Sequence, residues 1–289
     1  MGWLLDGLFD IIKQNLIEAI MARFAGIYDT INAEVGSIAG NVGQTPDDWN
    51  SGVFAMIRTL SETAVLRVAG MILTLVLCYE LIQVIIEKNN MHDFEVFNLY
   101  KWIFKTFCAV FILTHTFDIV MFVFALAQNV INAGAGAITG TLDMNADDAL
   151  VNLEAMLQTL GVFELMGLWL ETFLINICLT ILTICIFIII FGRMLEIYLT
   201  ISVAPIPLST MVNREWGQIG NNYLKGLFAL AFQGFLIMVC VAIYAALVAD
   251  IPMAGTVHGA IWGTVGYTVL LCFALFKTGS LSKSVFSAH

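Results

Sequence analysis

Long apolar runs alternate with shorter polar segments along most of this chain. A helix needs about 20 residues to cross a hydrocarbon core of about 30 Å. Five runs reach that length, two of them in 64–131 and three in 169–289. The predicted spans are residues 64–86, 103–131, 169–191, 226–249 and 257–276. The pattern therefore predicts an all-α polytopic membrane protein with about five transmembrane helices.

Residues 1–63 precede the first predicted span and follow a different pattern. Within 2–31, apolar residues recur three and four positions apart, which is typical of an amphipathic helix. These positions are Leu5, Phe9, Ile12, Leu16, Ile20, Phe24, Ile27 and Ile31. Charged residues such as Asp10 and Lys13 interrupt the run, and each would cost about 2.5–3.5 kcal/mol at mid-membrane. We therefore predict amphipathic helices that lie outside the cytoplasm or in the membrane interface.

A second helix start follows a glycine-containing link at 36–43. Thr45 is suited to cap a helix, and Pro46 fits the first turn. Asp47 and Asp48 would face the positive end of the helix dipole. The sequence predicts a helix that begins near Pro46 and runs into the first span.

Lysine and arginine are unevenly distributed among the loops. Neither occurs between Lys105 and Arg193, although seven acidic residues lie there. Segments poor in these cations are the ones exported across a membrane. We therefore predict that loop 132–168, with a short helix ending near Leu160, lies outside. The same rule predicts a cytoplasmic loop at 192–225, a cytoplasmic C-terminus and an outside N-terminus in a multi-pass protein of the cell (inner or cytoplasmic) membrane.

Residues 194–208 are also apolar but include two prolines. Pro205 and Pro207 cannot continue a helix. We interpret the segment as a cytoplasmic extension of the third span that turns at the prolines. A sixth span here would export Lys277 and Lys283, against the charge bias.

The overall composition supports membrane insertion and argues against several functions. Apolar residues make up 60% of the chain and charged residues 12%, with a net charge of −10. No direct high-affinity nucleic-acid binding is expected from such an acidic chain. All six cysteines lie in apolar runs, so neither a disulfide nor a metal site is expected. The sequence contains no phosphate-binding loop and no hydrolase motif, which argues against an enzyme and against a cofactor. A bound phospholipid is compatible with this composition.

Polar residues inside the predicted spans are the first candidate site. His115 and Asp118 lie three residues apart, on one face of the second span. By depth, Arg67 is expected near Asp118, and Glu80 near Lys105. Arg193 and Glu196, three residues apart, are expected to form an ion pair within one helix. Such groups form structural pairs or line a polar path, although a cation such as Lys105 can also extend to the head groups.

A second candidate lies on the fifth span, where small residues form a stripe. Such a stripe allows close backbone approach between membrane helices. Its members are Gly255, Gly259, Gly263 and Gly266. We interpret it as a packing face, with oligomer contact as one use.

The segment from Val203 to Ala246 carries a family resemblance. A helix ending in Ala204-Pro205-Ile206-Pro207 is followed by the loop Asn213-Arg214-Glu215-Trp216-Gly217-Gln218-Ile219-Gly220, and then by Asn222-Tyr223-Leu224-Lys225-Gly226 at the next span. This order resembles the TrbL-like conjugal transfer proteins, polytopic inner-membrane subunits of type IV secretion systems, in the form carried by conjugative elements of Gram-positive bacteria. The resemblance implies no enzymatic activity.

The resemblance also implies a role in the membrane core of a DNA or protein transfer machine, either as a scaffold or as part of the translocation channel. Its expected partners are copies of the same chain in a ring, a conjugation ATPase, a coupling protein, bitopic membrane subunits and the lipid bilayer. An exposed aromatic beside arginine is common among interface anchors, although Trp216 could instead rest in the head-group belt. The predicted partner interface is Pro205, Pro207, Arg214, Glu215 and Trp216.

Two other functions remain open at this point. A secondary transporter for a small solute would use the surroundings of Arg67, His115 and Asp118 as its coupling site. Transporters commonly show two related halves, and this chain has no convincing repeat. An assembly or lipid-organising protein without a conduit is the third reading.

Overall fold

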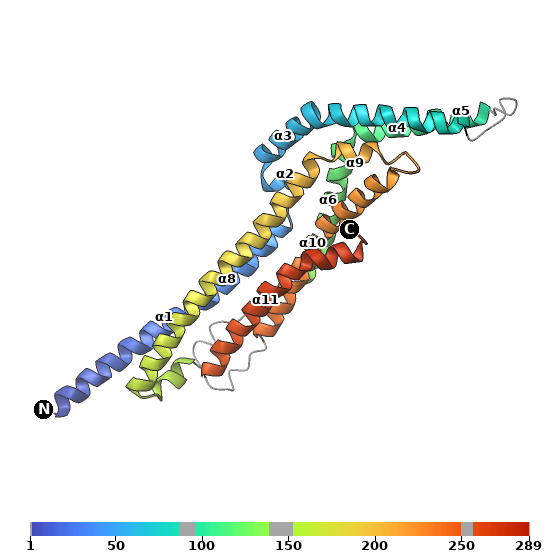
Figure 1. The fold of residues 1–289 in the computed structure, drawn as a ribbon. Coiled ribbons are helices and arrows are strands. Elements are labelled where there is room, and N and C mark those ends of the chain that lie inside the picture. The colour runs from blue at the N-terminus through green and yellow to red at the C-terminus, as the bar shows by residue number, and fades with distance from the viewer. Residues whose placement is uncertain (1, 87–95, 139–152, 250–256, 289) are drawn as a thin grey trace. The chain divides into compact units, whose positions relative to one another are not determined.

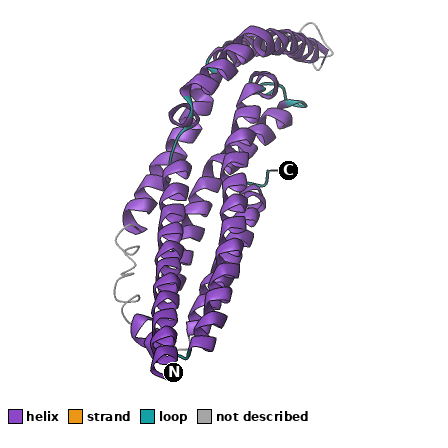
Figure 2. Ribbon diagram, turned by 90° about the vertical axis from the view of Figure 1, so that its left-hand side faces the viewer, coloured by secondary structure: helices purple, strands orange, loops and turns teal. Residues whose placement is uncertain are grey.

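The computed structural model describes residues 2–86, 96–138, 153–249 and 257–288. Every regular element in these ranges is a helix, as Figure 2 shows. Five helical stretches are long and apolar enough to cross a membrane. They are Ser51–Ile86, Thr116–Gly134, Val162–Ser209, Gly217–Val248 and Trp262–Val285. The prediction of an all-α polytopic membrane protein with about five such helices is confirmed.

The second predicted span differs from the observed helices. Instead of one helix over 103–131, the chain forms α5 (Val96–Thr114) and α6 (Thr116–Ile138), with a turn at His115. The hydroxyl of Thr114 donates to Val110 O at 2.9 Å, and that of Thr116 to Leu113 O at 2.9 Å. Threonine hydroxyls that bond back to helix carbonyls bend helices. Two of them flanking His115 account for the change of direction.

The described helices belong to two compact units, each built from separate parts of the chain. The first unit comprises Met1–Val42, Asn132–Ile190 and Leu236–Lys277. The second comprises Gly43–Ile131, Phe191–Phe235 and Thr278–His289.

In the first unit, α1 (Gly2–Val42) is one helix of 41 residues. The sequence predicted a link at 36–43, but the helix continues to Val42. The reason is that residues beyond Ile31 keep burying the same face. The buried side chains of α1 are Ile20, Phe24, Ile27, Val35, Ile38 and Val42.

α1 runs parallel to α8 (Val162–Ser202), as can be followed in Figure 1. Near the start of α1, Lys13 Nζ donates to Gln158 O at 2.8 Å. Ten residues later, Arg23 Nη1 donates to Trp169 O at 3.2 Å, and its guanidinium carbon lies 4.4 Å from the centre of the Trp169 ring. The remaining described helical parts of this unit come from the end of α6 (residues 132–138), from α10 (Gly217–Ala249), from α11 (Val257–Val285) and from residues 153–158. Of the short helix predicted in the outside loop, only this last part lies among the described residues.

The second unit starts with the predicted helix at Pro46. In α2 (Pro46–Trp49), the Thr45 side chain accepts from Asp48 N, and Pro46 occupies the first turn, which confirms the predicted start. The predicted helix is interrupted at Asn50, whose extended backbone ends α2 and whose side chain caps α3 (Ser51–Leu60). From α3 the helix continues through the π-helical segment η1 (Ser61–Val65) into α4 (Leu66–Ile86). α5 packs beside α4 (Figure 1).

The prolines end α8 as predicted. α8 stops at Ser202, and the short helix α9 (Pro205–Ser209) begins at Pro205. α9 packs against both α4 and α5. A buried cluster of Ala69, Leu73, Ala109 and Leu113 joins α4 to α5, with Ile206 packed against it.

Candidate partner-binding surface

The turn between α9 and α10 is held by one buried asparagine. Asn213 Oδ1 accepts from Glu215 N at 2.8 Å and from Trp216 N at 2.9 Å. Asparagine commonly stabilises turns in this way. Its Nδ2 donates to Glu80 Oε2 of α4 at 3.0 Å. Asn213 therefore fixes the turn and anchors it to α4.

Glu80 and Lys105 are brought together by the structure. Lys105 Nζ of α5 lies 2.5 Å from Glu80 Oε1. Glu80 is 7% exposed, while the Lys105 side chain retains 46% of its exposure. Because both oxygens of Glu80 have a partner, its charge is compensated. This pair, expected from the sequence, links α4 to α5 and to the turn.

Glu215 and Trp216 dock on the last turns of α4. Glu215 accepts from Tyr79 Oη and from Gln83 Nε2, each at 3.0 Å. The Trp216 ring stacks on Tyr79, with centroids 5.7 Å apart and planes 2° apart. Trp216 still remains 43% exposed. A rigid, half-open aromatic is the kind of group that anchors protein interfaces.

Arg214 completes this surface. Its side chain is exposed and lies between the buried Asn213 and the docked Glu215. We call residues 205–216 the α9 segment. Of the predicted interface residues, Pro205 is buried, Pro207 accepts from the Thr210 hydroxyl, and Arg214 and Trp216 point outward as exposed groups. Sequence reasoning gave Asn213 no role beyond its place in the motif, and it missed Tyr79 and Gln83 because only the fold brings α4 to this turn.

Loss of Glu80 is expected to destabilise the protein. In a Glu80→Ala chain, Lys105 loses its partner and Asn213 keeps an unsatisfied donor, at a cost of about 1–3 kcal/mol. Thermal unfolding of the detergent-purified protein should therefore start at a lower temperature. Glu62→Ala is the control, because Glu62 pairs with Arg58 in an exposed bridge worth about 0–1 kcal/mol. Equal effects of the two changes would contradict this reading of Glu80.

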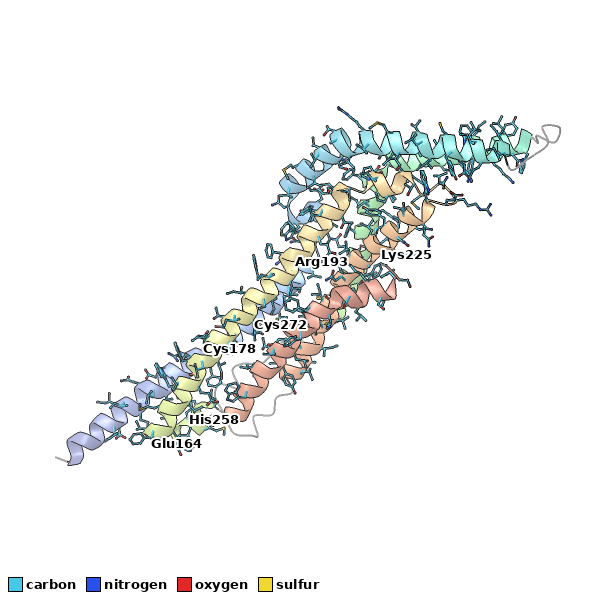
Figure 3. All side chains as sticks on the ribbon, viewed as in Figure 1. Glu164, Cys178, Arg193, Lys225, His258 and Cys272 are labelled. Carbon is cyan, nitrogen blue, oxygen red and sulfur yellow. The ribbon has the colours of Figure 1, made fainter. Side chains whose placement is uncertain are left out.

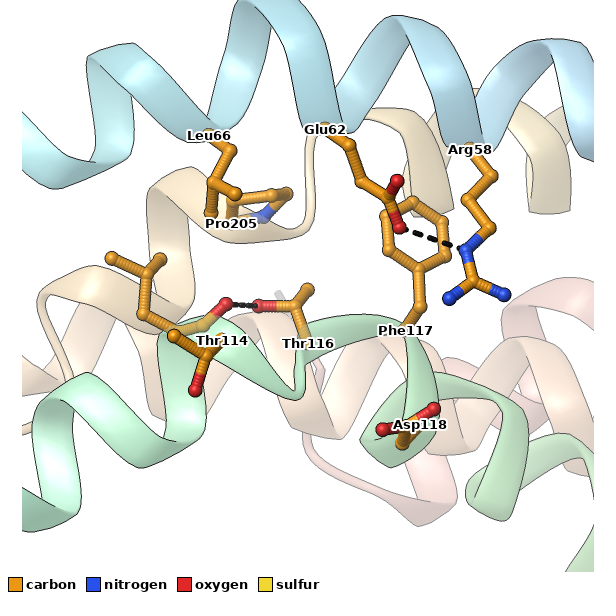
Figure 4. A pocket seen from close by; sticks show the side chains of 9 residues that line it. Arg58, Glu62, Leu66, Thr114, Thr116, Phe117, Asp118 and Pro205 are labelled. Carbon is orange, nitrogen blue, oxygen red and sulfur yellow. Dashed lines mark hydrogen bonds and ion pairs between the residues drawn. The ribbon is translucent and has the colours of Figure 1, made fainter.

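The surroundings of Asp118 differ from the expectation. Asp118 lines a cavity of about 40 Å³, which Figure 4 shows. The arginine in this cavity is Arg58, whose Nε lies 2.8 Å from Glu62 Oε1. Arg67 is exposed and does not line the cavity. The reason is that α3, η1 and α4 form one helix, and its rotation turns Arg58 rather than Arg67 toward α6.

His115 does not bond to Asp118 either. Its Nδ1 lies 3.0 Å from Phe111 O, and its ring stacks on Phe111 with centroids 4.3 Å apart. The turn at His115 breaks the single helix face on which the two residues were expected. The coupling site of the transporter reading is therefore not assembled by these residues.

Arg193 on α8 is buried, at 5% exposure, and is labelled in Figure 3. Its Nη2 lies 3.4 Å from Leu230 O of α10, while Nε and Nη1 have no hydrogen-bond partner among the described atoms. The sequence suggested an ion pair with Glu196. Instead, Glu196 Oε1 lies 3.1 Å from Lys283 Nζ of α11, because the Arg193 side chain turns inward toward α10.

The glycine stripe lies on α11, apart from Gly255, which falls outside the described residues. Gly259 and Gly266 are exposed, and Gly263 is half-buried. A methyl group at Gly266 would meet nothing within 4 Å. The stripe is thus open at Gly266.

Among the described residues, no group of three or more histidine, cysteine, aspartate or glutamate side chains is placed to hold a metal ion. The six cysteines are free thiols. The site is thus a surface of polar and aromatic side chains on a helical scaffold.

These features define a multi-span helical membrane protein with an ordered turn between its third and fourth apolar helices. The model of the family described as TrbL/VirB6 plasmid conjugal transfer like protein matches residues 31–205, more than half of the chain. The chain therefore belongs to this family, and the resemblance found in the sequence is confirmed. No curated protein and no solved structure matches it.

Proposed function

We propose that the chain is a scaffold subunit in the membrane core of a conjugative type IV secretion machine, working as an oligomer of identical copies. Membership of the TrbL/VirB6-like family carries this proposal. The five apolar helices suit a subunit embedded in the bilayer. The lysine and arginine distribution supports a cytoplasmic C-terminus and an outside N-terminus.

The α9 segment is the proposed contact for a cytoplasmic energy source. The sequence has no phosphate-binding loop, so mechanical work would have to arrive from an ATPase or a coupling protein. The exposed Arg214 and Trp216 lie on a turn fixed by Asn213 and Glu215. A pre-ordered surface loses little conformational entropy on binding. These observations support the α9 segment as the docking surface.

Deleting the encoding sequence from its conjugative element tests this function. Transfer of the element to recipients is expected to fall to background, while maintenance in the donor is unchanged. Expression of the intact chain in trans should restore transfer. Undiminished transfer by the deletion donor would contradict the proposal.

The glycine stripe offers a test of self-assembly. Leucine at Gly259 or Gly263 should separate helices that touch there, because overpacking costs about 1–3 kcal/mol. We expect smaller complexes on native gels after gentle extraction. Leu270→Ala is the control, since Leu270 is 57% exposed on the same helix and its truncation adds no bulk. Complexes of unchanged size in both glycine variants would place the contact elsewhere.

A further inference from the structure

In the first unit, α1 lies against the most apolar part of α8. Thr30, Glu34 and Ile38 of α1 line one cavity together with Leu179 and Ile186 of α8. The contact of Arg23 with Trp169 of α8 precedes this point along both helices. The contact of Lys13 with Gln158, just before α8, comes earlier still. Residues 30–38 of α1 are therefore level with residues 179–186 of α8.

At this level, the open face of α8 is made of aliphatic side chains. Ile181, Ile184 and Ile188 are 56%, 54% and 59% exposed. The apolar stretch containing them has a mean hydropathy of 3.0. Exposed isoleucines along such a stretch are the surface expected against acyl chains. This part of α8 thus lies within the hydrocarbon, and so does the part of α1 beside it.

The open face of α1 has a different composition. From Ala22 to Gly40, the exposed residues of α1 whose burial the structure describes are all small or polar, and methyl groups at Gly26, Gly36 and Gly40 would meet nothing within 4 Å. Apart from Thr30, which borders the cavity shared with α8, these exposed residues are Ala22, Gly26, Asp29, Asn32, Ala33, Gly36, Ser37 and Gly40. A carboxylate and an amide facing acyl chains are costly, and polar groups at this depth normally face protein or water. Lipid is therefore a poor neighbour for this face.

Water fits the face better than a second copy of α1. Asp29 occurs on this face in every copy, so direct contact between copies would bring like charges together. Water screens such charges far better than a protein interior does. Building on the proposed function, we infer that α1 crosses the membrane beside α8 and that its face around Asp29, Asn32 and Ser37 lines a water-filled path in the assembly.

In the second unit, the position of α4 agrees with this inference. Leu66, at the start of α4, lines a cavity with Pro205, and Glu80, near its end, bonds to Asn213. Both ends of α4 thus contact the α9 segment, which the charge distribution places on the cytoplasmic side. The inference takes α1 as a crossing helix in place of the apolar stretch Ser51–Ile86, and it assigns α4 to that side without a crossing. The number of crossings remains five, and both termini keep their predicted sides.

Two single cysteines, in a chain without the six native ones, test the crossing. In cells carrying the complete transfer system, Gln14→Cys is expected to react with an impermeant maleimide from outside. Gln44→Cys, just beyond the end of α1, should react only after permeabilisation. Labelling of Gln44→Cys in intact cells would show that α1 does not cross, and would overturn the inference.

A second pair tests the path. In native membranes, Ser37→Cys should react with a positively charged methanethiosulfonate at least about tenfold faster than Ile184→Cys, because the reactive thiolate forms in water and not in lipid. Equal, slow reaction at both positions would overturn the water-filled path. So would an oxidative cross-link between two copies at Ser37→Cys, which would show that a second copy covers the face. Labelling needs no recipient cells, so it is independent of the transfer assay that tests the proposed function.

Discussion

A chain carrying Arg214→Ala together with Trp216→Ala is expected to insert and assemble normally but to support no DNA transfer. Both side chains are exposed on the α9 segment, so their removal leaves the hydrogen bonds of Asn213 to the turn and to Glu80 in place. Interface anchors of these residue types cost about 2 kcal/mol or more of binding free energy when truncated. The loss of two is expected to detach the partner.

Mating assays and co-purification of the ATPase or coupling protein measure this effect. Arg214→Lys with Trp216→Phe is the matched control, because it keeps a cation and a ring that can stack on Tyr79. This control should retain part of the transfer activity. Normal transfer by a stably expressed double alanine variant would place the coupling surface elsewhere. The next region to test would be residues 87–102, of which 87–95 fall outside the described residues.

Replacing Gly220 by alanine is expected to disrupt the start of α10. A β-carbon there would lie 2.6 Å from Pro207 O and 2.1 Å from Met211 Cγ. The carbonyl belongs to the backbone, so α9 and α10 would have to separate. Overpacking of this kind costs about 1–3 kcal/mol. We expect lower abundance in the membrane, an earlier unfolding transition and reduced transfer.

Gly226→Ala on the same helix is the control, because it is expected to stabilise the protein where Gly220→Ala destabilises it. A β-carbon at Gly226 would meet nothing within 4 Å. Alanine in place of glycine stabilises a helix interior by about 0.5–1 kcal/mol. Unfolding should therefore be unchanged or shifted to higher temperature. A Gly220→Ala protein that behaves like Gly226→Ala would contradict the close approach of α9 and α10.

Features encoded in consecutive residues were predicted well. The cap at Thr45 with Pro46 behind it and the end of α8 before Pro205 depend only on neighbouring residues. Of the two interpretations open for Lys105, pairing with Glu80 or extension to the head groups, the structure shows the pair with Glu80, and the sequence alone did not decide between them.

Features that depend on how a helix is rotated were predicted poorly. Residue spacing alone could not show that Arg58, rather than Arg67, would face the cavity of Asp118. It could not show the turn at His115 either, because the bonds of Thr114 and Thr116 compete with a continuous helix only weakly. The spacing of the charges predicted that Arg193 would pair with Glu196. In the fold, Glu196 pairs with Lys283 instead.

The sequence by itself determined the class of protein, the five apolar helices, the proline-terminated helix and the family, because hydrophobicity, capping and motif order are properties of the chain. Only the tertiary structure decided that α1 lies along α8 and that Trp216 stacks on Tyr79. The physical reason is that an apolar face has many equally suitable neighbours. Which neighbour it meets depends on the packing of the whole unit.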